Sequence, residues 1–192
     1  MSPPDNPAVS PGRILFTEEA LRARVAELGR MIARDYAGRR PALVGVLQGS
    51  FVFMADLIRA ASIDLTTDFI GVVSYAAGTT SSGQVRLTSD LAVSIEAREV
   101  LIVEDVVDTG LTLDYLRRNL ELRRPKTVRV CVLLDKVERR RIDVRADYVG
   151  FTIPDVFVVG YGLDYDGLYR NLPYVAVLEA PAAGRSPRRV TL

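Results

Sequence analysis

The sequence predicts an α/β domain with a mostly parallel central sheet flanked by helices. Two runs, Ala42–Leu47 and Val100–Val103, carry no polar side chain, which is typical of strands covered on both faces of a parallel sheet. Segments with apolar residues at helical spacing alternate with such runs along the chain. With 192 residues, 48% of them hydrophobic, the chain can bury one core and is short for two. Ligands of this fold class bind at the carboxyl ends of the strands.

The first predicted element is a helix that Thr17 caps, because Glu18 and Glu19 favour its first turn and Leu21, Val25, Leu28 and Ile32 recur at helical spacing. Gly38 and Pro41 end this helix. The remaining elements, in chain order, are a strand over Ala42–Leu47, a helix over Phe51–Ala61, a strand over Ile63–Ser74, a loop over Tyr75–Gln84, a short strand over Val85–Thr88, a strand over Val100–Val103, a helix over Leu111–Leu122, and strands over Thr127–Leu134, Ala146–Phe151 and Val175–Leu178.

Both ends of the chain are predicted to be disordered tails. Residues 1–13 hold four prolines, and residues 181–192 are rich in Ala, Pro and Arg. Neither segment has the apolar surface needed to offset the entropy of ordering it. We therefore expect one domain over residues 14–180, followed by a basic tail.

Composition excludes several classes of function. The chain has no histidine, which removes imidazole bases and His-ligated zinc, and its only cysteine is Cys131, so no intrachain disulfide can form. No apolar run approaches the roughly 20 residues of a membrane helix. The net charge is +1 and three arginines lie in the last segment, so the body is mildly acidic and disfavours a wide nucleic-acid footprint. These features predict a soluble, cytoplasmic protein without membrane or nucleic-acid partners.

The strongest motif runs from Val103 to Thr112. An apolar strand leads directly into Glu104 and Asp105, then into Asp108 and the turn Thr109-Gly110-Leu111-Thr112, which opens a helix. Backbone amides and hydroxyls at a helix N-terminus can bind phosphate, while paired carboxylates can accept hydrogen bonds from sugar hydroxyls or face hydrated Mg²⁺. The combination predicts a ribose 5-phosphate site. Taken singly, these residues could equally be helix caps and a solvated strand end.

This motif resembles the 5-phosphoribosyl-1-pyrophosphate signature of type I phosphoribosyltransferases. The resemblance to their hypoxanthine-guanine branch extends from Gly45 to Leu178. It rests on the segments Gly45–Phe53, Ser74-Tyr75, Leu134-Asp135-Lys136 and Ile153–Tyr165. It implies a type I phosphoribosyltransferase-like fold with a small hood and a mobile lid loop, and a purine salvage activity. The implied reaction moves 5-phosphoribose from phosphoribosyl pyrophosphate to N9 of hypoxanthine or guanine, with Mg²⁺ as cofactor in a homodimer or homotetramer.

The resemblance also implies a role for individual residues. On the phosphoribosyl side, Glu104 and Asp105 bind ribose and metal, Asp164 is a further metal ligand, Thr109, Gly110 and Thr112 bind the 5-phosphate, and Gln48, Gly49 and Arg170 bind pyrophosphate. On the purine side, Asp108 is the general base at N7, Lys136 donates to the 6-oxo group, Phe157 stacks on the base, Val158 and Asp164 contact its edge, and Ser74 and Tyr75 belong to the lid. The family also leads us to expect a cis peptide bond before Gln48, where many relatives carry a basic residue.

The residues themselves support some of these roles. Without histidine, a carboxylate must act as base, and Asp108 lies between the sugar-binding pair and the phosphate turn. Lys136 follows an apolar strand and is one of two lysines, although it could be a solvated strand-end residue. Phe157 alone could be a core residue, and Asp164 alone could form a turn. Two alternatives share the fold: an RNA-binding regulator of pyrimidine genes, which the acidic body disfavours, and a uracil or xanthine transferase.

Overall fold

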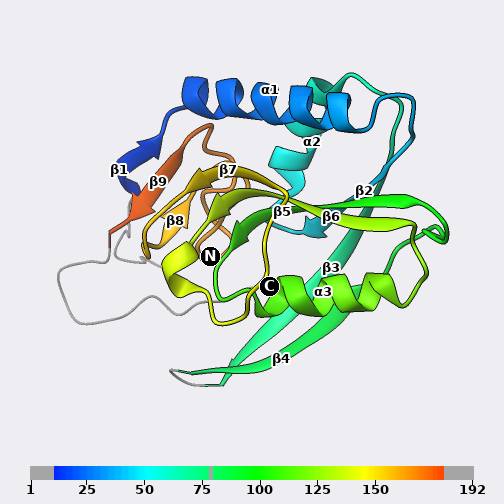
Figure 1. Ribbon diagram of the computed structural model, residues 1–192. Coiled ribbons are helices and arrows are strands. Elements are labelled where there is room, and N and C mark those ends of the chain that lie inside the picture. The colour runs from blue at the N-terminus through cyan, green and yellow to red at the C-terminus, as the bar shows by residue number, and fades with distance from the viewer. Residues whose placement is uncertain (1–10, 78–79, 180–192) are drawn as a thin grey trace, which may run out of the picture.

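The computed structural model describes residues 11–77 and 80–179, which form a six-stranded sheet and a smaller three-stranded one (Figure 1). The large sheet has the order β4-β3-β2-β5-β6-β7, in which only the pairing of β3 with β4 is antiparallel. Its strands are β2 (Ala42–Leu47), β3 (Thr66–Ala77), β4 (Thr80–Ser89), β5 (Glu99–Val107), β6 (Thr127–Asp135) and β7 (Tyr148–Thr152). The predicted α/β fold with a mostly parallel sheet is confirmed.

Helices cover both faces of this sheet, as Figure 1 shows: α1 (Glu18–Asp35) and α2 (Phe51–Ala61) lie on one face, and α3 (Leu111–Glu121) lies on the other. The alternation of side chains along each strand divides the core between the two faces. Leu101 packs with the α1–α2 side, whereas its neighbour Ile102 packs with the α3 side. Both side chains are fully buried, so the apolar run that predicted β5 reflects burial on both faces.

The first helix begins as the sequence predicts. The Thr17 hydroxyl accepts a hydrogen bond from the Ala20 amide at 3.3 Å, which satisfies one of the free N–H groups at the helix start. Helix α2 also has the predicted bounds, Phe51–Ala61, and Ser62 follows it in the left-handed conformation.

The small sheet corrects the predicted domain boundary. Strand β1 (Pro11–Phe16) pairs with β9 (Val175–Leu178), which pairs with β8 (Val158–Val159), all antiparallel. The start predicted at residue 14 is therefore wrong by three residues, because residues 11–13 gain a partner strand from the far end of the chain. The rest of the predicted tails, residues 1–10 and 181–192, lies outside the described residues.

The loop predicted over Tyr75–Gln84 is also wrong in extent. Strand β3 continues to Ala77 and β4 begins at Thr80, so most of this segment belongs to an antiparallel hairpin. Its small residues carry little apolar patterning, and cross-strand backbone pairing supplies the order that the pattern did not predict. Strands β3 and β7 begin two or three residues later than predicted.

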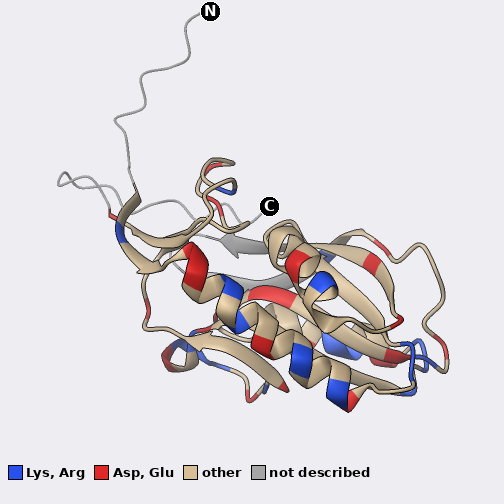
Figure 2. Cartoon of the chain, turned by 90° about the horizontal axis from the view of Figure 1, so that it is seen from above, with Lys and Arg blue, Asp and Glu red and all other residues tan. Residues whose placement is uncertain are grey.

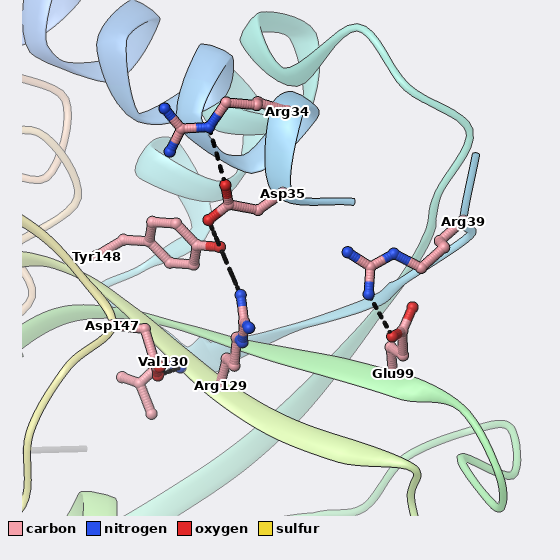
Figure 3. A network of polar contacts seen from close by, with 8 residues as sticks. All are labelled: Arg34, Asp35, Arg39, Glu99, Arg129, Val130, Asp147 and Tyr148. Atoms are coloured by element: carbon pink, nitrogen blue, oxygen red, sulfur yellow. Dashed lines mark hydrogen bonds and ion pairs between the residues drawn. The ribbon is translucent and has the colours of Figure 1, made fainter. Parts of the chain in front are cut away.

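A polar network closes the amino ends of the parallel strands, opposite the ends where ligands are expected (Figure 3). The Tyr148 hydroxyl donates to Asp35 at 2.9 Å and accepts from Arg129 at 3.2 Å, which ties α1 to strands β6 and β7. Burial, followed by the hydrogen bond to Asp35, raises the pKa of Tyr148 to about 12. Arg39 pairs with Glu99 at 2.7 Å at the start of β5. These contacts connect α1 and the loop after it to the sheet. Asp35, Arg129, Arg39 and Glu99 therefore have a structural role at the end of the sheet opposite the candidate site. Across the described residues, no helix combines the length and apolarity that a membrane crossing requires.

Candidate active site

The candidate site lies where strands β2, β5 and β6 end side by side. Strand β2 leads into Gln48-Gly49, β5 into Asp108-Thr109-Gly110, and β6 into Lys136. Val107 and Asp135 are register partners, and the Lys136 amide donates to the Val107 carbonyl at 2.9 Å. The three predicted segments are thus neighbours because their strands are parallel and adjacent.

Glu104 is a buried carboxylate and Asp105 is half-buried, so neither belongs to the solvated strand end that was the alternative. Glu104 is 7% exposed, and its Oε2 has no hydrogen-bond partner among the described residues. Burial, together with the charge of Asp105, raises the pKa of Glu104 well above its usual range. Burial also raises the pKa of Asp105 to about 6, opposed by backbone amides and the Arg170 guanidinium. An unpaired buried carboxylate is costly, so this pair is suited to accept donors from a ligand.

Gly49 lies directly against Asp105. A Cβ on Gly49 would be 2.5 Å from Asp105 Cγ and closer still to Oδ2, so only glycine lets this backbone approach the carboxylate. The peptide bond between Leu47 and Gln48 is cis, as expected from the resemblance, and the Gln48 side chain is exposed. Gly162, which the sequence motifs did not single out, packs on the Gly49 carbonyl with a φ of +99°. In the sequence, the closely spaced glycines at 160 and 162 are the feature that could have indicated this close packing.

The predicted phosphate turn opens α3 as expected. Gly110 occupies the N-cap with a φ of +87°, a left-handed conformation that favours glycine. The Thr109 hydroxyl accepts from the Leu111 amide at 3.4 Å, and the Thr109 carbonyl accepts from the Arg141 amide at 3.0 Å. Thr112 lies in the first turn of α3 and is half-buried. The turn therefore presents helix-start amides beside two hydroxyl residues, a combination able to bind phosphate.

Asp108 and Lys136 are linked by two charged residues that the sequence motifs did not single out. Arg139 Nε donates to Asp108 Oδ1 at 2.9 Å, and Arg139 Nη1 donates to Asp155 Oδ2 at 3.0 Å. Asp155 Oδ1 lies 3.9 Å from Lys136 Nζ. Lys136 is only 4% exposed. The alternative hypothesis that it is a solvated residue at a strand end is therefore wrong.

The segment after β7 brings in the remaining predicted residues. Phe157 is half-buried and makes an edge-on contact with Tyr165, with ring centroids 5.8 Å apart, and Val158 is buried in β8. Arg170 pairs with Asp164 at 2.8 Å and donates to the Gly162 carbonyl at 2.6 Å. The charges of Arg170 and Asp164 both act on the pKa of Asp105, which places this pair close to the Asp105 carboxylate.

The predicted metal ligands do not assemble into a metal-binding group. Within residues 11–77 and 80–179, no three His, Cys, Asp or Glu side chains come together as one. Asp164 accepts from Arg170 and from the Gly167 amide, so the three-ligand set of Glu104, Asp105 and Asp164 stays a prediction. The unpartnered Glu104 oxygen and the neighbouring Asp105 still fit Mg²⁺ in its common mode, with few carboxylates and with waters and substrate phosphates completing the shell.

The predicted lid residues, Ser74 and Tyr75, lie in strand β3, next to the hairpin end. Their side chains lie outside the described part of the structure, so the lid stays a prediction.

Comparison with known proteins assigns the family. Residues 14–166 match the family model of the phosphoribosyl transferase domain. The chain is 47% identical over 167 residues to a hypoxanthine-guanine phosphoribosyltransferase of Streptococcus mutans, covering 87% of this chain and 93% of that protein. It is equally similar to the bifunctional TilS/HprT protein of Listeria monocytogenes, of whose length it spans 26%.

Solved structures agree with this result. A hypoxanthine phosphoribosyltransferase of Trypanosoma cruzi, in complex with the product IMP, superposes with a TM-score of 0.81 at 50% identity, over 88% of this chain and 95% of that one. The chain belongs to the phosphoribosyl transferase domain family, in the branch of the hypoxanthine-guanine phosphoribosyltransferases.

Proposed function

We propose that the protein transfers the 5-phosphoribosyl group of phosphoribosyl pyrophosphate to N9 of hypoxanthine or guanine, giving IMP or GMP and pyrophosphate. One observation carries this proposal: the phosphate turn, the acid pair Glu104-Asp105 and the buried lysine occupy the ends of adjacent strands. Gly49 contacts Asp105 on one side, and the Lys136 amide bonds to Val107 on the other. The relatives named above act on these purines, which supports the same choice here.

In the proposed reaction, the bond from ribose C1 to pyrophosphate breaks and its electron pair leaves with pyrophosphate. The new bond forms between C1 and purine N9. Positive charge that develops on the ribose is stabilised by Glu104 and Asp105 in their ionised forms. The Gly49 backbone and Arg170 would stabilise the negative charge that leaves on pyrophosphate.

Mg²⁺ is the proposed cofactor, and it would neutralise charge on the pyrophosphate oxygens when it is bound. Glu104, Asp105 and Asp164 are the residues that would face it, in part through water. Arg170 would keep Asp164 oriented, because the two side chains are paired at 2.8 Å.

On the purine side, we propose that Asp108 accepts the proton that N7 releases as N9 bonds to C1. Lys136 would donate to the 6-oxo group, and its burial makes this contact selective. A buried ammonium that meets the 6-amino group of adenine is left facing a donor, and such unpaired buried groups discriminate strongly. Phe157 and the Val158 backbone would contact the base, and Ser74 and Tyr75 would belong to a closing lid.

The alternative of an RNA-binding regulator gains no support from the charge distribution. Acidic residues are interspersed among the basic ones along α1, so this helix has no purely basic run (Figure 2). A homodimer or homotetramer and a cytoplasmic location stay predictions, which light scattering of the purified protein and cell fractionation would test.

The decisive experiment measures pyrophosphate release from phosphoribosyl pyrophosphate with hypoxanthine, guanine, xanthine, adenine and uracil in turn. We expect turnover with the first two bases in the presence of Mg²⁺, and loss of turnover in EDTA that added Mg²⁺ restores. Turnover restricted to uracil or xanthine, or none with any base, would overturn the proposal.

A further inference from the structure

One guanidinium lies between two carboxylates that come from different segments of the chain. Arg139 belongs to the short 3-10 helix η1 (Val137–Arg139), directly after the purine-side lysine. Its Nε bonds to Asp108 in the turn after β5, and its Nη1 bonds to Asp155 in the loop after β7, at 2.9 and 3.0 Å. Two such charge-assisted bonds fix both carboxylates relative to one planar group.

The second carboxylate continues the chain of charges toward the purine side. The oxygen of Asp155 that Arg139 does not contact lies 3.9 Å from Lys136 Nζ. Negative and positive groups therefore alternate from Asp108 through Arg139 and Asp155 to Lys136. The two ends of this chain are the proposed base at N7 and the proposed donor to the 6-oxo group, which flank one edge of the same purine.

The backbone of η1 is held independently of the Arg139 side chain. The Arg139 amide donates to the Lys136 carbonyl at 3.0 Å, and the Arg140 amide donates to the Val137 carbonyl at 3.1 Å. The Arg140 side chain pairs with Asp135 and donates to the Asp108 backbone carbonyl at 3.4 Å. Arg140 thus holds the turn, and Arg139 holds the carboxylate of Asp108. The hydrogen bond to Asp108 and its charge raise the pKa of Arg139.

We propose that Arg139 is a positioning residue that keeps the Asp108 carboxylate ionised and oriented toward purine N7, and that couples it to Lys136 through Asp155. This inference rests on the proposed function of the site. A guanidinium bonded to one carboxylate oxygen restricts rotation of the carboxylate and favours its charged form. The bridge to Asp155 links the base and the 6-oxo donor, so that both groups are placed together.

The test compares R139M and R139K with the control R145M. Arg145 pairs with Asp143 at 3.4 Å, and both side chains are more than 80% exposed, so R145M removes a neighbouring ion pair that touches nothing in the site. The readout is kcat/KM for hypoxanthine against pH, at saturating phosphoribosyl pyrophosphate. The charged groups near Asp108 include Arg139 and Arg140, with Asp155 and Lys136 behind them.

For R139M, we expect kcat to fall about tenfold and the acidic limb of the profile to move up by about half a pH unit. Loss of a nearby positive charge raises the pKa of a carboxyl group, and solvent limits the size of the effect. R139K should keep the acidic limb of the pH profile near its wild-type position and recover part of kcat. Lysine restores the positive charge but lacks the planar guanidinium that bonds to both carboxylates. R145M should match the wild type.

A double-mutant cycle with D155N tests the coupling. The effects of R139M and D155N on kcat/KM should be clearly less than additive, because each removes the same bridge. An active wild type whose acidic limb does not move in R139M, or strict additivity in the cycle, would overturn the inference alone. A wild type without purine turnover would instead overturn the proposed function, and the inference with it.

Discussion

Replacing Gly49 by alanine tests the close approach on which the candidate site depends. Gly49 is one of the residues that we propose for pyrophosphate, and Asp105 is one that we propose for ribose. The substitution adds a single methyl group between them and changes no charge. Its effect therefore reports how much the chemistry depends on this contact.

The size of the effect follows from the geometry. The added Cβ would lie 2.5 Å from Asp105 Cγ and 3.1 Å from Oδ1, whereas non-bonded atoms rest about 3.5–4.0 Å apart. The carboxylate must therefore retreat by roughly 1 Å or more. Overpacking of this kind costs about 1–3 kcal/mol, which a domain stable by about 5–15 kcal/mol survives. A displacement of about 1 Å in a reacting site can cost about 100-fold in rate.

The assay pairs kinetics with thermal unfolding. For G49A we expect kcat/KM for phosphoribosyl pyrophosphate to fall about 100-fold, while the melting temperature falls by only about 3–10 °C. G38A is the matched control, because Gly38 has a φ of +70° and open space around it, so it acquires backbone strain away from the site. A G49A enzyme within about threefold of the wild type would refute the reasoning, since this is far below the loss expected for such a displacement.

Three further predictions concern the charged residues of the site. K136A should raise the KM for hypoxanthine and relax the rejection of adenine in initial-rate assays, whereas K126A, at the chain's other lysine, should change neither. D108N should lower kcat by about 10²- to 10⁴-fold while calorimetry shows phosphoribosyl pyrophosphate binding retained. Burial raises the pKa of Asp105 from 3.8 to about 6, so the folded state binds this proton more tightly than the unfolded state. The resulting stability is present in acid and lost as pH rises through about 6. Urea unfolding should therefore find D105N close to the wild type near pH 4 and clearly more stable than the wild type near pH 8.

Each of these expectations has a contrary outcome. Unchanged purine kinetics in K136A would remove Lys136 from the purine site. Near-normal turnover in D108N would remove Asp108 as the base. Equal stability of D105N and wild type at alkaline pH would show that the Asp105 carboxylate is not desolvated in the free protein.

Local signals predicted the elements that stand next to the site. Helix α2 has the predicted bounds, and α1 has the predicted cap at Thr17, because both depend on spacing and on residues at the helix ends. The run Val100–Val103 predicted β5, and the acidic residues after it continue that strand to Val107. The sequence did not predict the strand order; in the structure β5 and β6 are adjacent and parallel, and this brings the turn after β5 next to Lys136.

The features that the sequence pattern did not predict depend on contacts between distant segments. Strand β1 contains Pro11 and Gly12 and is ordered by pairing with β9, which lies at the other end of the domain. Strand β8 has two residues, too few for any periodicity. Arg139 and Asp155 read as ordinary surface charges until three strand ends place them beside Asp108. The pattern of apolar and polar residues indicates burial and local backbone preference. It does not indicate which charged side chains form ion pairs with each other.

The two glycines beside the acid pair explain why the site needs this particular arrangement. Gly162 packs on the Gly49 carbonyl, and Gly49 packs on Asp105, so two successive layers of backbone approach the Asp105 carboxylate without an intervening side chain. The backbone near Gly49 can thereby approach the same ligand that the carboxylates of Glu104 and Asp105 contact. In the free protein, Glu104 keeps an oxygen without a partner in the described structure, which opposes folding. A ligand that brings hydroxyl donors and a hydrated cation would relieve that desolvation, so the same burial that weakens the free state strengthens binding of a phosphoribosyl group.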